Sequence, residues 1–202
     1  LEGSVHYMKI AADEEERKAV YESVRASRLY DDALSMYKVN ASLSEATFEL
    51  GRACAFTPGW LENESVWLHM EYKYLLELLK AGMYQEFTED FHKAAVPFLN
   101  EEQYGRSLLE NSSFIASSAN PNPRYHGKGF VARLSGGAAE FLEMWEIMMF
   151  GKQPFSVRAG KLELSFEPCF PEYLTGEEKT ITATFLGSIP VTYKLPEQRA
   201  IL

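Results

Sequence analysis

The spacing of apolar residues changes near residue 155, and this change limits the folds that the chain can adopt. Up to Phe150 the apolar residues recur at intervals of three and four, which is typical of amphipathic helices that pack on other helices. After Pro154 they alternate with polar residues, which is typical of strands with one buried face. The sequence therefore predicts a mainly α protein with a C-terminal β segment, divided into a helical region 1–155 and a strand region 156–202.

Four helices and three strands are expected from this pattern. An acidic first turn at residues 13–16 predicts a helix that continues to about Arg28. Further helices are expected at residues 66–78, 87–98 and 138–149, and strands at residues 161–166, 181–185 and 191–195. Because three short strands with one apolar face are not stable alone, we expect them to lie on the helices or to join strands of another polypeptide.

The composition argues against several classes of partner. The net charge is −9 and no run of lysine or arginine occurs, so neither nucleic acid nor an anionic membrane is expected as a partner. The longest apolar stretch, residues 147–150, is far too short to span a bilayer. Cys54 and Cys169 are too few for a disulfide framework or a zinc site. We therefore expect a cytoplasmic protein with no metal and no organic cofactor.

One segment, residues 57–74, is rich in side chains that bind sugars. Glu62 and Asn63 can exchange hydrogen bonds with hydroxyl groups, and Trp67 can stack on the apolar face of a pyranose ring. His69 adds a titratable group at the start of the expected helix. The alternative interpretation is a capped helix with a buried tryptophan and a histidine satisfied inside the core.

A second segment precedes the expected helix at 138–149. Ser135 offers a hydroxyl, and Gly136 offers a backbone N–H at the helix N-terminus, which together suit a phosphate or a carboxylate. Small residues at this position are also used simply for tight packing, so the segment alone leaves both interpretations open.

Three segments in order resemble motifs of the cellobiose and chitobiose phosphorylase family. Residues 62–69, Glu-Asn-Glu-Ser-Val-Trp-Leu-His, resemble its Lys-Glu-Asn-Gly-Gly-Ile-Phe-x-His segment. Residues 134–138, Leu-Ser-Gly-Gly-Ala, are similar to its Leu-Thr-Gly-Thr-Ala segment. Residues 150–154 and 167–171 resemble its Leu-Gly-Ile-Arg-Pro and Asp-Pro-Cys-Ile-Pro run. The resemblance extends from about Ala53 to Pro171.

The resemblance implies part of an (α/α)6 barrel followed by a small antiparallel β layer. It also implies inverting phosphorolysis of a disaccharide, in which inorganic phosphate is the co-substrate and attacks the anomeric carbon. His69 would help to hold the phosphate beside Ser135 and the Gly136 N–H. Glu62 would hold sugar hydroxyls, and Glu110 matches a glutamate of a Glu-Pro-Tyr-Val segment in the family.

The catalytic residue is not among the matched positions. The family's general-acid aspartate lies well upstream of the Glu-Asn motif, whereas only 61 residues precede Glu62. We therefore expect a C-terminal part of a phosphorylase-like protein, either a fragment or one product of a split gene, that joins an upstream barrel half or forms a homodimer or larger assembly. Two alternatives stay open: a non-catalytic carbohydrate-binding or assembly module, and a hydrolase in which Glu62 or Glu110 acts through water.

Overall fold

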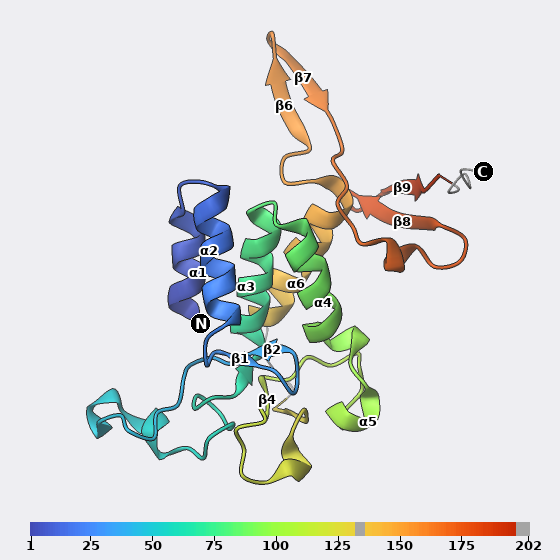
Figure 1. The fold of residues 1–202 in the computed structure, drawn as a ribbon. Coiled ribbons are helices and arrows are strands. Elements are labelled where there is room, and N and C mark those ends of the chain that lie inside the picture. Colours follow the sequence, from blue (N-terminus) through green and yellow to red (C-terminus); the bar gives the residue numbers. More distant parts are fainter. Residues whose placement is uncertain (132–135, 197–202) are drawn as a thin grey trace, which may run out of the picture. The chain divides into compact units, whose positions relative to one another are not determined.

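The chain is a mixed α/β protein. A computed structural model describes residues 1–131 and 136–196, and in that part of the chain 42% of residues are helical and 17% lie in strands (Figure 1). The strands form four small antiparallel sheets. The prediction of a mainly α chain, built as part of an (α/α)6 barrel followed by a small antiparallel β layer, is therefore wrong.

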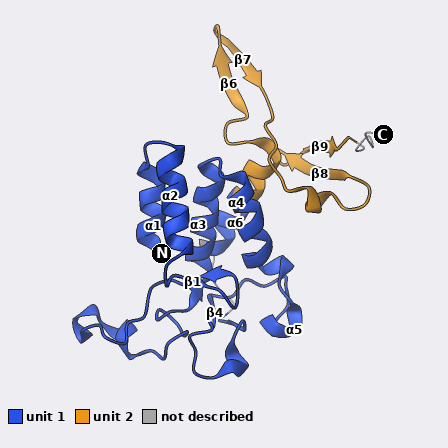
Figure 2. Ribbon diagram, viewed as in Figure 1, with its two compact units in different colours: residues 1–143 blue, residues 144–202 orange. Residues whose placement is uncertain are grey.

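The chain divides into two compact units, residues 1–143 and residues 144–202 (Figure 2). The division falls within the helix α6, which runs from Gly136 to Phe150. The change of apolar spacing near residue 155 thus comes shortly after this helix ends.

The first unit is built on helices that match the apolar pattern. Its helices are α1 (Glu2–Ile10), α2 (Glu14–Arg25), α3 (Leu68–Lys80), α4 (Tyr84–Ala94) and the short α5 (Glu101–Tyr104). Helix α1 packs on α2 and α3, and α3 packs on α4. The helices predicted near residues 13, 66 and 87 are confirmed in position, whereas α1 had no clear pattern and was not predicted.

Local chemistry sets where these helices begin and end. The Asp13 carboxylate accepts a hydrogen bond from the Glu16 N–H at 2.9 Å, so α2 begins after an N-cap aspartate as its acidic first turn indicates. Helix α2 ends at Arg25, three residues before the predicted end. Helix α4 ends at Ala94, and residues Val96–Phe98 form a separate 3-10 turn, because Pro97 has no N–H to continue the helix.

Five two-residue strands gather at the end of the helices where α3 begins (Figure 1). β1 (Tyr30–Asp31) pairs with β2 (Met36–Tyr37), and β4 (Phe114–Ile115) lies between β3 (Val66–Trp67) and β5 (Gly129–Phe130). Strands this short cannot display an alternating pattern, which is why the sequence predicted only helices in this region. Close packing restricts which residues these strands can hold. At Gly129 in β5 a Cβ would collide with the Ser112 hydroxyl and the Tyr104 ring, so this position of the sheet requires glycine.

Short 3-10 turns complete the loops of this unit. They are η1 (Phe48–Leu50), η2 (Arg52–Ala55), η3 (Val96–Phe98) and η4 (Pro123–Tyr125).

The second unit consists of the end of α6 and two hairpins. β6 (Phe155–Arg158) pairs with β7 (Lys161–Leu164), and β8 (Thr180–Phe185) pairs with β9 (Ile189–Lys194); a 3-10 turn, η5 (Glu172–Thr175), precedes β8. The predicted helix at 138–149 and the three predicted strands are confirmed in position, and β6 was not predicted. Helix α6 stops at Gly151, whose φ of +83° suits glycine, and Tyr193 Oη donates to the Met149 carbonyl at 2.6 Å.

The hairpin of β6 and β7 has one apolar and one polar face. Its register places Phe155 opposite Leu164 and Val157 opposite Leu162, so the four side chains share one face. All four are exposed. The polar face includes an ion pair between Arg158 and Glu163.

Candidate functional site

The predicted sugar-binding segment folds as a tight turn before β3. Trp60 and Asn63 exchange two backbone hydrogen bonds of 3.1 Å, which leaves Leu61 and Glu62 at the tip. Gly59 permits the close approach of a neighbouring loop, because a Cβ there would lie only 2.5 Å from the Asn120 backbone nitrogen. Glu62 and Asn63 are therefore held by the backbone rather than by a helix cap.

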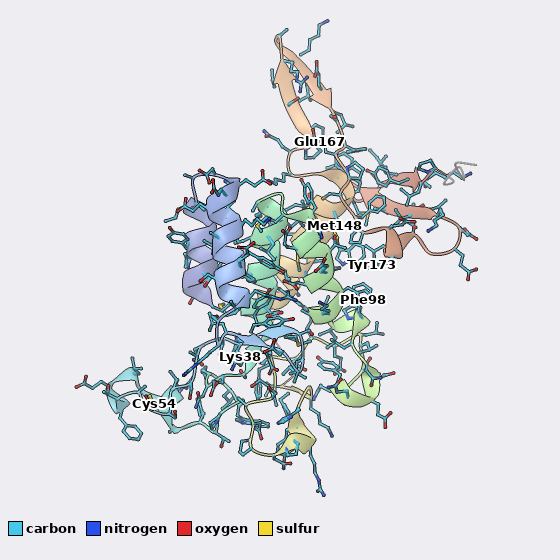
Figure 3. All side chains as sticks on the ribbon, in the orientation of Figure 1. Lys38, Cys54, Phe98, Met148, Glu167 and Tyr173 are labelled. Carbon is cyan, nitrogen blue, oxygen red and sulfur yellow. The ribbon has the colours of Figure 1, made fainter. Side chains whose placement is uncertain are left out.

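The polar side chains of this turn are only partly satisfied by hydrogen bonds and ion pairs. One carboxylate oxygen of Glu62 forms an ion pair with Arg52 at 2.8 Å, while Oε2 is buried and has no hydrogen-bond partner in residues 1–131 and 136–196. Asn63 donates to the Phe56 carbonyl at 2.8 Å, and its Oδ1 is likewise buried without a partner. Lys38, labelled in Figure 3, forms an ion pair with the neighbouring Glu64 at 3.0 Å. Two buried acceptors of the turn thus lack a donor.

Five aromatic side chains from the turn, the 3-10 turn η4 and the strands β3, β4 and β5 form a cluster: Trp60, Trp67, Phe114, Tyr125 and Phe130. The Trp60 ring lies 4.4 Å from Phe130 and 5.1 Å from Phe114, measured between centroids. Trp67 stacks on Phe114 with an interplanar angle of 9°. Phe114 is buried, whereas both tryptophans remain partly exposed. Partly exposed aromatic rings beside carboxylate and amide groups have the chemistry of a sugar site.

His69 lies in the first turn of α3, next to the first turn of α6. Its Nε2 lies 3.1 Å from Glu140 Oε1, and a Cβ on Gly137 would lie 3.7 Å from the His69 Cα and backbone nitrogen. Trp67, the N-cap residue of α3, supplies no side-chain acceptor to the helix N–H groups. Glu140 is mostly buried, and its Oε2 has no hydrogen-bond partner among the described residues. The His69 imidazole therefore lies near the N-terminal ends of both α3 and α6.

The structure brings some of the predicted site residues together and not others. Gly136 begins α6, one residue from the Gly137 contact with His69, whereas Ser135 lies outside the described residues. Glu110 forms an ion pair with Arg106 at 3.3 Å. Among the described residues, no hydrogen bond or ion pair joins Glu110 or Glu62 to His69. His69 thus lies beside the start of α6, whereas the Glu110 side chain contacts Arg106.

Glu140 was not predicted as a site residue. It is the one carboxylate among residues 136–142, the otherwise apolar first part of α6, and this charge in an apolar run is the signal that could have identified it.

A polar network of four residues, the buried Tyr37 and Asp90 and the partly exposed Tyr21 and Arg25, was also missed. Asp90 accepts hydrogen bonds from Arg25 Nη1 at 2.5 Å and from Tyr37 Oη at 2.6 Å. Tyr21 Oη donates to the same carboxylate at 3.2 Å. Burial, together with the Asp90 charge, raises the pKa of Tyr21 to about 12 and raises that of Tyr37 further. We refer to these four residues as the Asp90 network.

Glu71 lies beside this network in the interior of the first unit. Its Oε2 accepts a hydrogen bond from the Tyr37 N–H at 3.0 Å, and no group in the described part of the chain donates to its Oε1. Burial raises the pKa of Glu71 well above the usual value of 4.5, and the Asp90 charge raises it further. The carboxyl group therefore resists ionisation in the folded protein.

Residues 1–131 and 136–196 include no group of three or more His, Cys, Asp and Glu side chains that could hold a metal ion. Across the same residues, every helix is too short or too polar to cross a membrane.

Comparison with known protein families finds no match for the chain, and comparison with curated proteins finds none either.

Proposed function

We propose that the chain is the C-terminal part of a cytoplasmic glycoside phosphorylase-like protein, which binds inorganic phosphate and a sugar where α3 and α6 begin. The observation that carries the proposal is the close packing of His69 on the first turn of α6, where a Cβ on Gly137 would lie 3.7 Å from the His69 backbone. An imidazole and N–H groups of two helices on one spot suit an anion, since the N-terminal ends of helices attract negative charge.

The neighbouring groups support a sugar beside the phosphate. Glu62, Asn63 and Glu140 each have a buried oxygen without a donor in the described part of the chain, and hydroxyl groups of a sugar or of monohydrogen phosphate would supply the missing donors. The partly exposed rings of Trp60 and Trp67 adjoin this turn and would cover the apolar face of a pyranose.

The ion pairs of the two candidate carboxylates favour a second function for this chain on its own, namely non-catalytic carbohydrate binding. Glu62 is paired with Arg52 and Glu110 with Arg106, so both candidate carboxylates are already engaged in ion pairs within the chain. Sugar release by the chain alone, and by the chain joined to its upstream polypeptide, distinguishes the two functions. Cleavage that requires phosphate identifies phosphorolysis, and cleavage that proceeds in its absence identifies a hydrolase.

Phosphate binding is expected to depend on His69. Titration of the chain with inorganic phosphate, followed by calorimetry, should reveal saturable binding that His69→Ala weakens by about tenfold or more, because the variant removes a charge-assisted donor. His6→Ala, at an exposed position of α1, is the control and should leave binding unchanged. The absence of binding at millimolar phosphate would contradict the proposal.

We also propose that the chain associates with a second copy or with upstream polypeptide. The exposed apolar face of β6 and β7 supports this, because a two-stranded hairpin is stable only when such a face is covered. Light scattering of the chain at micromolar concentration should give a mass above that of the 23.0 kDa monomer. Val157→Lys together with Leu162→Lys should lower that mass, whereas a monomeric mass for the unaltered chain would contradict self-association.

A further inference from the structure

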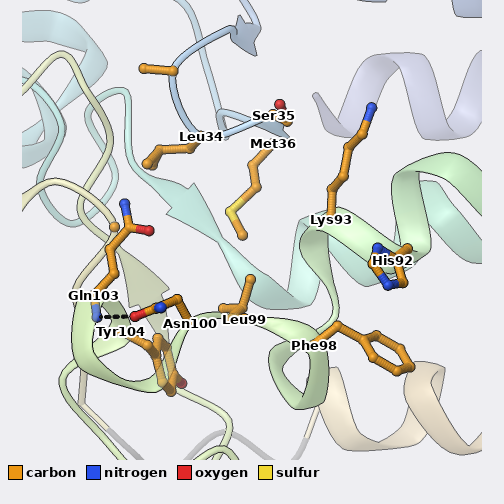
Figure 4. Close-up of a pocket in the computed structure, with 12 residues that line it drawn as sticks. Leu34, Ser35, Met36, His92, Lys93, Phe98, Leu99, Asn100, Gln103 and Tyr104 are labelled. Carbon is orange, nitrogen blue, oxygen red and sulfur yellow. Dashed lines mark hydrogen bonds between the residues drawn. The ribbon is translucent and has the colours of Figure 1, made fainter.

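A cavity of about 260 Å³ lies in the first unit, between the β1–β2 turn, the C-terminal end of α4 and helix α5 (Figure 4). It is separate from the candidate site at His69, and none of its lining residues belongs to that site. Sites for drug-sized ligands measure about 300–1,000 Å³. This cavity therefore suits a smaller ligand, about the size of one sugar ring.

Polar side chains line the cavity, and those of Lys93, Asn100 and Gln103 are exposed to solvent. Lys93 makes no ion pair with any described residue, and the amide of Gln103 and the hydroxyl of Ser35 make no hydrogen bond within the described segments. Asn100 accepts a hydrogen bond from the Gln103 N–H at 2.9 Å through Oδ1, which leaves its NH₂ group available (Figure 4). The cavity thus offers one positive charge and several neutral hydrogen-bonding groups.

Apolar side chains occupy the space between these polar groups. In Figure 4, Met36 extends from the β1–β2 side toward Leu99, with the Asn100 and Gln103 side chains to one side and Lys93 rising from α4 on the other. Met36 is almost fully buried, so this wall is held in place by the core. An apolar wall flanked by amide, hydroxyl and ammonium groups matches a ligand that has a C–H face, a rim of hydroxyls and one negative charge.

We propose that this cavity binds a monosaccharide acid, with the sugar carboxylate on Lys93 and the ring hydroxyls on Ser35, Asn100 and Gln103. The site does not depend on the phosphate and sugar site proposed above, because it shares none of those residues. The ligand charge is matched by Lys93 alone, which makes this lysine the residue that distinguishes acidic from neutral sugars.

Calorimetric titration of the full chain with glucuronate and with glucose tests the proposal. Glucuronate should bind saturably, and glucose should bind about tenfold or more weakly because it lacks the charge-assisted contact. Lys93→Met should reduce glucuronate affinity to that of glucose. Ala33→Trp, which adds an indole at an exposed position of the cavity lining, should abolish the glucuronate binding that depends on Lys93.

Matched controls separate the site from general charge effects. Lys18→Met removes a charge from an exposed position of α2 and should leave glucuronate binding unchanged, as should His69→Ala. Equal affinity for glucuronate and glucose, an equal loss in Lys18→Met and Lys93→Met, or no saturable binding of glucuronate would each overturn the proposal. Glutamate binding as tightly as glucuronate would show that the site takes a carboxylate without a sugar, and would overturn it as well. Because His69→Ala is tested in parallel with phosphate, failure here is distinguishable from failure of the phosphate site.

Discussion

Replacing Asp90 with alanine should lower the free energy of unfolding by about 3–5 kcal/mol, the usual cost of removing one partner of a buried ion pair. The Asp90 side chain is 1% exposed and accepts hydrogen bonds from Arg25, Tyr37 and Tyr21. Without the carboxylate, a guanidinium and two phenol groups lose their acceptor in a poorly solvated place. Urea denaturation of both proteins measures the difference.

A neighbouring glutamate provides the control for this experiment. Glu89 lies next to Asp90 on α4 but is exposed, and it has only a weak contact of 3.5 Å with Gln85. Glu89→Ala has the same charge change and a similar helix propensity effect, and should change stability by less than about 0.5 kcal/mol. A loss in Asp90→Ala as small as that in Glu89→Ala would contradict the importance of the Asp90 network.

Glu71→Gln should remove a large part of the pH dependence of stability. Because the folded protein holds the pKa of Glu71 above its usual 4.5, the stability linked to this group is complete below pH 4.5 and is lost as the pH rises toward the folded-state pKa. Glutamine keeps an acceptor for the Tyr37 N–H but cannot ionise. The variant should therefore gain stability relative to the unaltered chain as the pH increases, by about 1.4 kcal/mol for each unit of pKa shift.

Denaturation curves at several pH values between about 5 and 8 measure this change, and the slope of the difference is independent of any constant effect of the amide. Glu22→Gln, at an exposed position of α2, changes the net charge equally and should leave the slope unaltered. A difference between Glu71→Gln and the unaltered chain that stays constant with pH would mean that Glu71 ionises as an exposed glutamate does.

The helices could be predicted from the sequence because each presents several apolar residues on one face. Helix α3 illustrates this: Leu75 and Leu78 recur at helical spacing, and both are fully buried. The five strands of the first unit could not be predicted, since two residues carry no period and their pairing is set by distant segments such as β4. The (α/α)6 barrel implied by the family resemblance was wrong for the same reason, because it required helices in the region where these strands form.

The candidate site was predictable only where it depended on local motifs. The order of the motifs suggested that His69 and Gly136 belong together, and the structure places His69 beside Gly137. Glu140 was missed because its importance arises from contact with His69 across two helices, which no single segment reveals. Asp90 was missed for the same reason. Its position on the buried face of α4 indicates that the carboxylate has a partner, but the sequence does not identify this partner as Arg25.

The position of β3 directly before α3 has a consequence for the order in which the protein folds. The α3–α4 pair is formed by neighbouring segments, whereas β3 reaches its place only by pairing with β4, after a long stretch of chain has been closed into a loop. The first turn of α3, with His69, is thus expected to become ordered later than the rest of its helix. Hydrogen exchange should reveal the reverse order on opening: the amides of this turn should exchange through local fluctuations while the middle of α3 stays protected.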